Sequence, residues 1–476
     1  MRGFFFTVCV LISVLSYGQQ AKKVWTLREL VDYAISSNLT VKRSNYNVRS
    51  GEINYLQSKM AMLPSLNAST NYGYNWGRNI DPTTNLFVEQ RINSINANAS
   101  SSLLLWNGFR LFYAMKQSEA ELDAINKDMI KARNDVILNV ITLYLNVVFN
   151  KELYANAEYQ LNSTRQQLDR TNKLVEAGAL PRADALNLEA QFATNELNLI
   201  QRENALNLSL LQLKQALQLP ASTEMDVELL NVDLTDPAIN KSSEEIYEIA
   251  VMSMPEIEAA RLRQKSSVLA LRSTRGNYYP RLSVNGSLST LYSSARQEAL
   301  LQGTTIVPRE IGYLQNNPGE LVYTNVEVNQ FSFQTVSHQE QFRNNLGKGL
   351  GFNLQIPIFN GFQARSAVQR AAINRELADI SLIENENMLR QSVETAYNDA
   401  VAASKTYQSA QKQVGARDEA FRMTKQRFES GAANFVEYQV AENDLFQSQS
   451  DLLRAKYDFI FRKKVLDFYQ GLPLDF

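Results

Sequence analysis

The chain carries one sequence signature twice at a fixed separation, and this duplication constrains the fold more than any other feature. Asn107-Gly108-Phe109 recurs 253 residues later as Asn360-Gly361-Phe362. The same separation links Val140 and Tyr144 to Val393 and Tyr397, Gly178-Ala179 to Gly431-Ala432, Glu189 to Glu442, and Leu219-Pro220 to Leu472-Pro473. Chance similarity between two helical segments would not keep register over more than a hundred residues. The sequence therefore predicts two copies of one structural unit.

Upstream of these matches the separation changes to 216, which places the boundaries of the two copies. Leu63-Pro64-Ser65-Leu66 aligns with Tyr279-Pro280-Arg281-Leu282, and Asn38-Leu39-Thr40-Val41 aligns with Met254-Pro255-Glu256-Ile257. The second copy thus has 253 − 216 = 37 extra residues, all between Pro280 and Asn360. We predict a first repeat at 19–220, a connector at 221–242 and a second repeat at 243–476.

Each repeat is expected to begin with a helical stretch followed by two strands. The helical stretches, 26–63 and 243–279, both end at a proline, which disfavours helix at the preceding residue. Apolar and polar residues then alternate with period two, which is typical of strands with one apolar and one polar face. The predicted strands are 66–78, 93–106, 281–293 and 346–359.

A long helical hairpin is predicted to complete each repeat, at 109–219 and 362–470. Neither run contains a proline before its glycine, and a first arm of about seventy residues would be ~100 Å long. Such a length favours a coiled coil, and leucines seven residues apart in the returning arm of the first hairpin support this reading. Gly178 and Gly431 are the predicted hairpin turns.

The first twenty residues have the features of an export signal. Arg2 precedes an apolar run from Phe4 to Leu15, and small residues lie near Gly18, so we predict a cleaved signal peptide at 1–18. An uncleaved membrane anchor is the alternative, although the apolar run is short for a span. The single cysteine, Cys9, lies within this segment, which leaves no disulfide or cysteine metal site in the mature chain. With 48 basic and 49 acidic residues, nothing indicates a nucleic-acid partner.

The strand faces point to a membrane barrel built by several chains. One face is apolar, with Tyr72, Tyr74, Trp76 and Tyr292 near one end, as expected of lipid-facing strands with an aromatic belt. The other face carries almost only Asn, Ser and Gly, as a water-filled lumen requires; a soluble β-sandwich is the alternative. Four strands cannot close a barrel, and an open sheet edge cannot remain in lipid. The predicted fold class is therefore an α+β membrane protein whose barrel is shared between copies.

These features together resemble one known family, the TolC-like outer-membrane efflux channels (outer membrane factors). The resemblance covers nearly the whole mature chain and rests on the duplicated order of elements together with short quoted segments. These are "LPSL" and "YPRL" before strands, "WNGF" and "FNGF" after strands, and "EAGALPRAD" and "ESGAANFVE" at the hairpin turns. The resemblance implies a homotrimer in the outer membrane of a Gram-negative bacterium, in which twelve strands form one barrel and twelve helices form a periplasmic tunnel.

The resemblance also implies a function and its residues. The protein would be the exit duct of a tripartite efflux or type I secretion system, passively conducting substrate from a periplasmic adaptor and an inner-membrane pump. The adaptor would dock on the hairpin tips, formed by Gly178, Ala179, Leu180, Gly431, Ala432 and Ala433. The Asn-Gly-Phe turns, Asn107, Gly108, Phe109, Asn360, Gly361 and Phe362, would join barrel strands to tunnel helices.

Two acidic residues are candidates for the pore constriction. Asp184 and Glu437 each follow their tip glycine by six residues, where the family places inward-facing acids; ordinary solvated acids are the alternative. At the place where the family often has a basic partner this chain has Ala433, and Arg182 or Lys173 could substitute for that partner.

Two other classes of protein compete with a duct. An envelope enzyme finds no support, because the only histidine, His338, has no partners and is expected to be a solvated loop residue. No cofactor is indicated. A coiled-coil structural protein of the envelope without a pore would explain the heptads but not the strands. The segment 293–345 is predicted to be an extracellular loop, with a folded insertion that plugs the barrel or binds a partner as the alternative.

Overall fold

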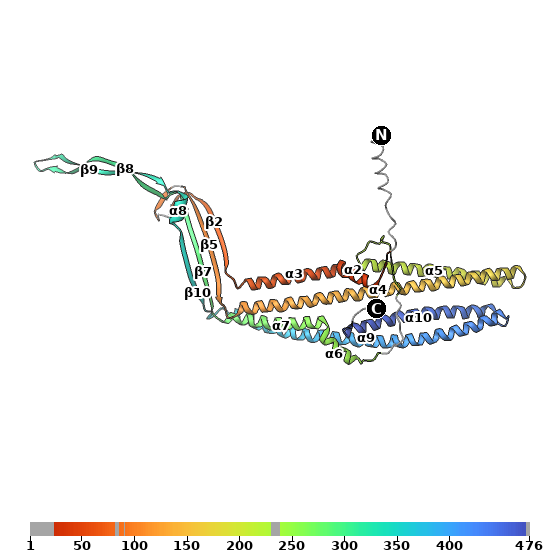
Figure 1. Ribbon diagram of the computed structural model, residues 1–476. Helices are drawn as coiled ribbons and strands as arrows, with labels where there is room; N and C mark the ends of the chain where they lie inside the picture. The colour runs from red at the N-terminus through yellow and green to blue at the C-terminus, as the bar shows by residue number, and fades with distance from the viewer. Residues whose placement is uncertain (1–22, 81–84, 90, 230–238, 473–476) are drawn as a thin grey trace, which may run out of the picture. The chain divides into compact units, whose positions relative to one another are not determined.

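The computed structural model describes residues 23–80, 85–89, 91–229 and 239–472 (Figure 1). The predicted signal peptide at 1–18, with Cys9, lies outside the described residues.

The described chain forms two compact units, and each draws on both sequence repeats. The helical unit comprises the residues up to 54 together with 117–268 and 373–476, and the strand unit comprises 55–116 and 269–372. The repeats are therefore not compact domains. The reason is that strands from the two repeats pair with each other, as do the helices.

Two helical hairpins dominate the helical unit, and the corresponding arms of the two hairpins have the same length. α4 (Arg110–Glu176) and α9 (Gln363–Glu429) have 67 residues each, and α5 (Arg182–Ala216) and α10 (Phe435–Tyr469) have 35 residues each. Every one of these boundaries recurs at the separation of 253. At 1.5 Å per residue the longer arms measure ~100 Å. Figure 1 shows the two hairpins as antiparallel helix pairs whose turns lie at the same end of the unit.

The two hairpin turns have the same hydrogen-bond pattern. Gly178 and Gly431 have positive φ angles of 72° and 74°. The amide of Gly178 donates to the Val175 carbonyl and that of Ala179 to the Leu174 carbonyl, and the corresponding bonds recur at Gly431 and Ala432. This is the Schellman ending of a helix, in which glycine accepts a left-handed conformation that other residues adopt at a cost.

The helical stretch that opens each repeat is two helices rather than one. α2 (Leu27–Ser37) and α3 (Leu39–Met60) are separated at Asn38, while α6 (Ser243–Ser253) and α7 (Pro255–Arg275) are separated at Met254. The prediction of one continuous stretch was wrong at the same place in both copies. The second break has a clear cause, because Pro255 is tolerated at a first helical position and forces its predecessor out of helix. A one-turn 3-10 helix, η1 (Gly276–Tyr278), then leads into the sheet.

A matching pair of capping boxes begins the first helix of each repeat. The Thr26 hydroxyl accepts from the Glu29 amide, and the Glu29 carboxylate accepts from the Thr26 amide. Ser242 and Glu245 form the same pair 216 residues later. This reciprocal arrangement satisfies two backbone donors at a helix start and stabilises it by roughly 1 kcal/mol.

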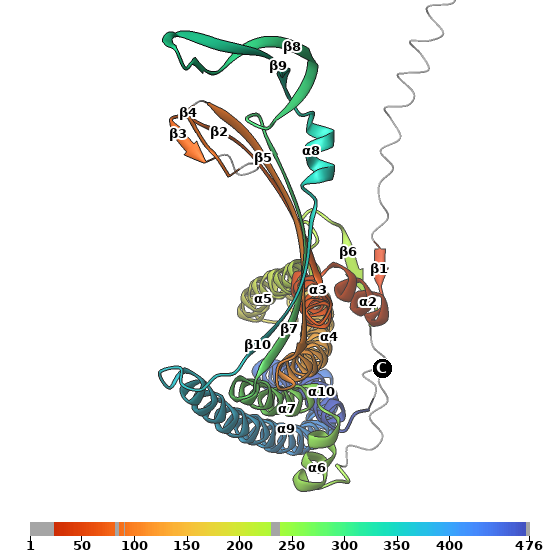
Figure 2. The same cartoon turned by 90° about the vertical axis from the view of Figure 1, so that its left-hand side faces the viewer.

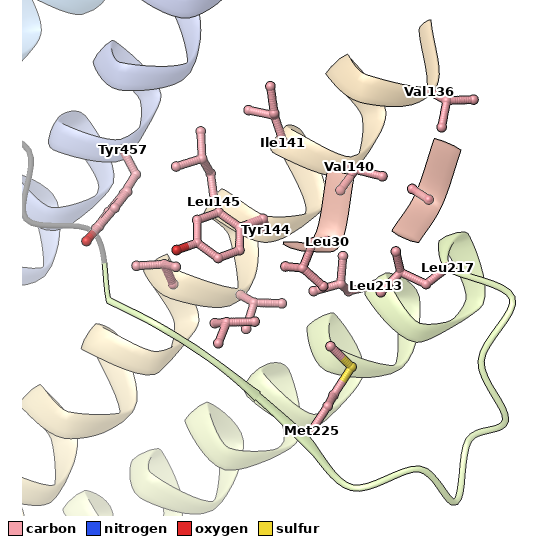
Figure 3. Packing of buried hydrophobic residues seen from close by; sticks show 14 of the residues in the cluster. Leu30, Val136, Val140, Ile141, Tyr144, Leu145, Leu213, Leu217, Met225 and Tyr457 are labelled. Carbon is pink, nitrogen blue, oxygen red and sulfur yellow. The ribbon is translucent and has the colours of Figure 1, made fainter. Parts of the chain in front are cut away.

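The main core of the helical unit surrounds the middle of α4 (Figure 3). Val140 and Tyr144 are each 1% exposed and pack with Leu30 of α2 and with Leu213 of α5. Their counterpart in the second repeat, Val393, is fully buried in a separate cluster with α6 and α10. A parallel pair of short strands, β1 (Lys23–Trp25) and β6 (Met225–Val227), covers the first core.

This packing explains why the middle of the α4 sequence is so apolar. Among the described residues, α4 is the one helix with a window long and apolar enough to span a membrane, and 44% of that window is buried within the protein. Its apolar side chains between Val136 and Val148 belong to the core cluster.

Four strands form one antiparallel sheet in the order β10-β7-β5-β2 (Figure 1). Their bounds are Ser65–Asn75 for β2, Ile92–Trp106 for β5, Arg281–Ser293 for β7 and Gly347–Gln355 for β10. The sequence places β7 at the observed residues and extends β10 too far. Pro357 has no amide hydrogen to donate to the ladder, so the strand ends before it.

The register brings like faces together across the sheet. One face of the sheet gathers most of the apolar side chains of all four strands. These are Leu66, Ala68, Thr70 and Tyr72 of β2, Ile95, Ala97 and Ala99 of β5, Val284 and Leu288 of β7, and Leu350, Phe352 and Leu354 of β10. The opposite face carries mainly small polar residues, among them Asn67, Ser69, Asn71, Asn98, Ser100, Asn285, Ser287, Gly349, Gly351 and Asn353, and it also carries Leu104, Leu291 and Arg281. One face of the sheet is therefore mostly apolar, with Lys348 as a charged exception, and the other is mostly small and polar.

The segment 293–345 is not a loop, contrary to the sequence prediction. It forms a long hairpin of β8 (Gln297–Leu314) and β9 (Asn317–Thr335), followed by the short helix α8 (His338–Asn344), which Figure 2 shows beside the upper sheet. Register shifts after Leu301 and Glu310 in β8 interrupt its alternation, which hid the strand in the sequence. Predicted strand 66–78 also ends early, because Arg78–Ile80 forms β3 and pairs with β4 (Phe87–Glu89).

Candidate functional site

The two Asn-Gly-Phe turns have the same backbone geometry. Gly108 and Phe109 have φ angles of 64° and 62°, and Gly361 and Phe362 have 59° and 62°. The amide of the fourth residue donates to the asparagine carbonyl in both, at 3.3 Å for Arg110 and 3.2 Å for Gln363. Positive φ at both central residues is the condition of a type I′ turn. The first turn connects the end of β5 to α4. The second directly precedes α9, and its last residue lies seven residues after the end of β10.

The first turn is more tightly enclosed than the second. A Cβ at Gly108 would lie 2.7 Å from the Cβ of Tyr279, whereas one at Gly361 would meet nothing within 4 Å. Asn107 is 6% exposed, and the nitrogen of its side chain, Nδ2, has no hydrogen-bond partner within the described part of the chain.

The six candidate docking residues lie at the exposed turns of the hairpins. Gly178, Ala179, Gly431 and Ala432 are exposed, and Leu180 and Ala433 are half-buried. Behind them Leu188 of α5 packs with Phe435 and Tyr438 of α10, against Leu168, Phe421 and Phe428 from the outgoing arms. Leu168 and Leu188 of the first hairpin thus pack on the aromatic side chains of the second, and small side chains remain on the outer surface of both tips.

The two candidate pore acids differ in their surroundings. Asp184 is half-buried in the first turn of α5, and its backbone amide donates to the Pro181 carbonyl at 3.1 Å. Glu437 is exposed, accepts a hydrogen bond from the Asn434 side chain at 3.0 Å and lies 3.4 Å from the Arg427 guanidinium. The basic partner of Glu437 is therefore Arg427, at the end of the outgoing arm, rather than Arg182 or Lys173. An exposed ion pair of this kind adds little stability.

A buried polar layer joins the two hairpins near their tips. The Ser163 hydroxyl donates to the Glu442 carboxylate at 3.0 Å, and the Tyr438 hydroxyl lies 3.4 Å from the same oxygen. Burial raises the pKa of Glu442, partly offset by these two hydrogen bonds and by Lys425. Burial and the neighbouring Glu442 also raise the pKa of the Tyr438 hydroxyl. Side-chain amides extend the layer through the pairs Gln439–Gln191, Gln191–Asn443 and Asn195–Thr164.

His338 is not in a loop but is the first residue of α8. Its ring is exposed and stacks on Tyr292 of β7, with centroids 3.8 Å apart. Among the described residues, no group of three or more His, Cys, Asp or Glu side chains is arranged to hold a metal ion.

The family model described as outer membrane efflux protein matches residues 30–218 and 246–466, which together cover most of both repeats. The chain belongs to this family. Outer membrane protein TolC of Escherichia coli (strain K12) is 21% identical over 418 residues, covering 86% of this chain and 74% of that protein. Outer membrane protein OprJ of Pseudomonas aeruginosa is 25% identical over 448 residues, covering 89% and 79%. A crystal structure of CusC, from a study of transmembrane channel formation, superposes with a TM-score of 0.73 at 14% identity over 96% of both chains.

The family membership confirms the resemblance read from the sequence. This outer membrane efflux protein is an exit duct of the outer membrane for efflux or secretion. Sequence reasoning missed two parts of its tip region, Arg427 and the role of Glu442. Glu442 was visible only as a repeat landmark matched to Glu189, and no pattern in the sequence distinguishes its half-buried position from the exposed position of Glu189.

We expect the packing of the two hairpins to depend on pH through Glu442. Because folding raises the pKa of this carboxyl, its stabilising contribution is fully present below the ordinary glutamate pKa and is lost as pH rises through the raised value. The wild type should therefore be better protected from hydrogen exchange at about pH 5 than at about pH 8. Glu442→Gln mimics the neutral carboxyl, so this variant should show the same protection at both pH values. Amide hydrogen exchange of segments 160–195 and 435–445, corrected for intrinsic rates, measures this protection.

Glu189→Gln is the matched control, since it removes the repeat-equivalent acid from an exposed site. It should leave the pH dependence of the wild type in place. Wild-type protection that does not change with pH would show that Glu442 does not couple the hairpins to proton concentration.

Proposed function

We propose that three copies of this efflux protein close one twelve-stranded barrel in the outer membrane and continue it as a helical tunnel toward a periplasmic adaptor and an inner-membrane pump. The observation that carries the proposal is the four-stranded sheet with one apolar face, one polar face and two open edges. β10 and β2 each have one side without a strand partner within the described chain. In lipid these backbone groups need hydrogen bonds, which further copies of the same sheet supply.

Strand directions allow this closure without a break in the pattern. All three pairings in the sheet are antiparallel, so β10 and β2 run in opposite directions. Pairing β10 of one copy with β2 of the next keeps the barrel antiparallel throughout. The apolar face then contacts lipid, and the face of Asn, Ser and Gly lines a water-filled lumen. β8 and β9 follow the end of β7 that is remote from η1, so we propose that they lie outside the cell.

The face assignment is tested by arginine at two adjacent positions of β10. Leu354→Arg puts a charge on the apolar face and should cost ~2–4 kcal/mol near the bilayer midplane, which lowers the yield of assembled protein in the outer membrane. Asn353→Arg puts the same charge on the polar face and should assemble normally. Both residues are exposed in the isolated chain, so neither change disturbs a protomer core. Assembly of the Leu354 variant together with failure of the Asn353 variant would reverse the faces.

The hairpin tips are proposed to dock the adaptor. The support is their surface of small exposed side chains, which allows close approach of another helix end, over an aromatic cluster that fixes both tips. The Schellman bonds hold this surface through main-chain groups, so its side chains can change without unfolding the turn.

Bulky charge at the tips should therefore abolish docking and spare assembly. Ala179→Glu combined with Ala432→Glu is expected to weaken adaptor binding by about tenfold or more, because a desolvated charge without a partner is costly at an interface. Binding of purified adaptor to the purified efflux protein measures the effect, and the oligomer mass provides the assembly control. Unchanged adaptor affinity with a normal mass would place docking elsewhere.

Asp184 and Glu437 are proposed to narrow and charge the closed end of the tunnel. Three copies would bring six carboxylates to one pore, and acidic rings favour cations. The Arg427 ion pair partly compensates Glu437, whereas no ion pair of Asp184 is found in the described part of the chain. Asp184 should therefore contribute more of the selectivity.

Single-channel recording in planar bilayers tests this assignment. Asp184→Asn should reduce the preference for cations more than Glu437→Gln, and the double variant should lose it. The exposed acids at the ends of the outgoing arms, Glu176 and Glu429, are the control pair. If Glu176→Gln with Glu429→Gln has the same effect, the selectivity comes from diffuse charge and not from a ring.

A further inference from the structure

A pocket rich in arginine lies in the strand unit where strands give way to helices. Its volume of ≈ 970 Å³ lies within the range of about 300–1,000 Å³ that is usual for sites of small organic ligands. Its walls come from the Asn-Gly-Phe turns, the η1 segment, the ends of β7 and β10, and the first turns of α4 and α9. The basic lining residues are Arg110, Arg281 and Arg370, and the lining contains no aspartate or glutamate.

No carboxylate of the described residues compensates the charge of the three guanidinium groups. None of them forms an ion pair within the described residues, and Arg281 donates only to the side-chain oxygen of Gln355 at 2.8 Å. Three like charges around one pocket repel one another, which disfavours the arrangement unless an anion or water compensates them. Packing does not explain the arrangement either, because Arg281 and Arg370 are exposed.

Other groups at the pocket reinforce its preference for negative charge. The first turns of both α4 and α9 lack an acidic residue, so the positive ends of two 67-residue helices are uncompensated there. Asn107 forms part of the wall and is only 6% exposed. Its side-chain nitrogen Nδ2 has no hydrogen-bond partner among the described residues. Both observations are independent of the arginine side chains.

The remaining wall is apolar. Ile356, Pro357, Ile358 and Phe359 line it between β10 and the second turn. A ligand that satisfies both walls has an anionic group for the guanidiniums and a hydrophobic body for this strip. Inorganic anions satisfy only the first wall.

We propose that this pocket binds amphiphilic organic anions, with the charged group between Arg110 and Arg370 and the apolar body against Ile356 and Phe359. Arg281 and Gln355 pair across β7 and β10 on the polar face of the sheet. A role of the pocket in transport rests on the proposed function, in which this polar face lines the lumen. Anionic substrates would then bind in the pocket as they pass from the tunnel to the barrel. Binding itself does not depend on that position.

Equilibrium dialysis of the purified, assembled protein with 1-naphthalenesulfonate tests the pocket, and 1-naphthalenemethanol is the neutral probe of similar shape. The wild type should bind the sulfonate more tightly than the alcohol, with one site per chain. Arg110→Gln combined with Arg370→Gln should weaken sulfonate binding by about tenfold or more and leave the alcohol unaffected, because charge-assisted hydrogen bonds are lost.

Arg365→Gln is the matched control. Arg365 lies near the same helix start but outside the pocket lining, with its guanidinium 5.7 Å from the Phe362 ring centroid. Sulfonate binding should survive this change. Equal weakening by Arg365→Gln, or wild-type binding by the double variant, would overturn the site, and so would a wild type that does not prefer the sulfonate. A conducting protein that binds no sulfonate refutes the pocket alone, whereas sulfonate binding without conducting pores refutes the proposed duct alone.

Discussion

The architecture depends on one requirement, the hydrogen bonding of the backbone at the two edges of the four-stranded sheet. A strand edge in water can bond to solvent, but an edge in lipid needs another strand. β2 and β10 present such edges, one from each repeat, and the sheet joins the repeats at its centre through β5 and β7. In the proposed barrel, the duplicated chain supplies two pairs of strands whose free edges, at β2 and β10, are complementary. The long helices follow from the same plan, because each outgoing pair of strands continues into one α-helical hairpin.

Much of the fold was predictable because its periodic signals are long. The two hairpins run for more than a hundred residues each, and their only left-handed tip glycines, Gly178 and Gly431 among the described residues, were visible as helix breakers. The breaks at Asn38 and Met254 were missed, since each interrupts a helical pattern for a single residue. β8 was missed because its register shifts change which residues face each side, so the alternation that predicted the other strands is interrupted. The ion pair of Arg427 with Glu437 joins the two arms across the turn, and a spacing of ten residues has no helical pattern that predicts it.

The two repeats keep the same backbone but use equivalent positions differently. Gly108 is pressed against Tyr279, whereas Gly361 has open space around it. Glu442 is buried in the polar layer, and Glu189 is exposed. At the ends of the returning arms, a left-handed position is occupied by Gln218 in one repeat and by Gly471 in the other. The two copies thus share their backbone geometry and differ in the packing and chemistry of equivalent side chains.

The equal length of the outgoing arms has a consequence for how such a chain can change. α4 and α9 each have 67 residues, and near their far ends Leu168 of α4 packs in one cluster with Phe428 of α9 and Tyr438 of α10. Removing seven residues from one arm alone would shorten it by ~10 Å and pull its aromatic partners out of reach. Lengthening or shortening is compatible with this cluster only when both arms change together. The lengths of the two helices are therefore coupled, and a change in one arm requires an equal change in the other.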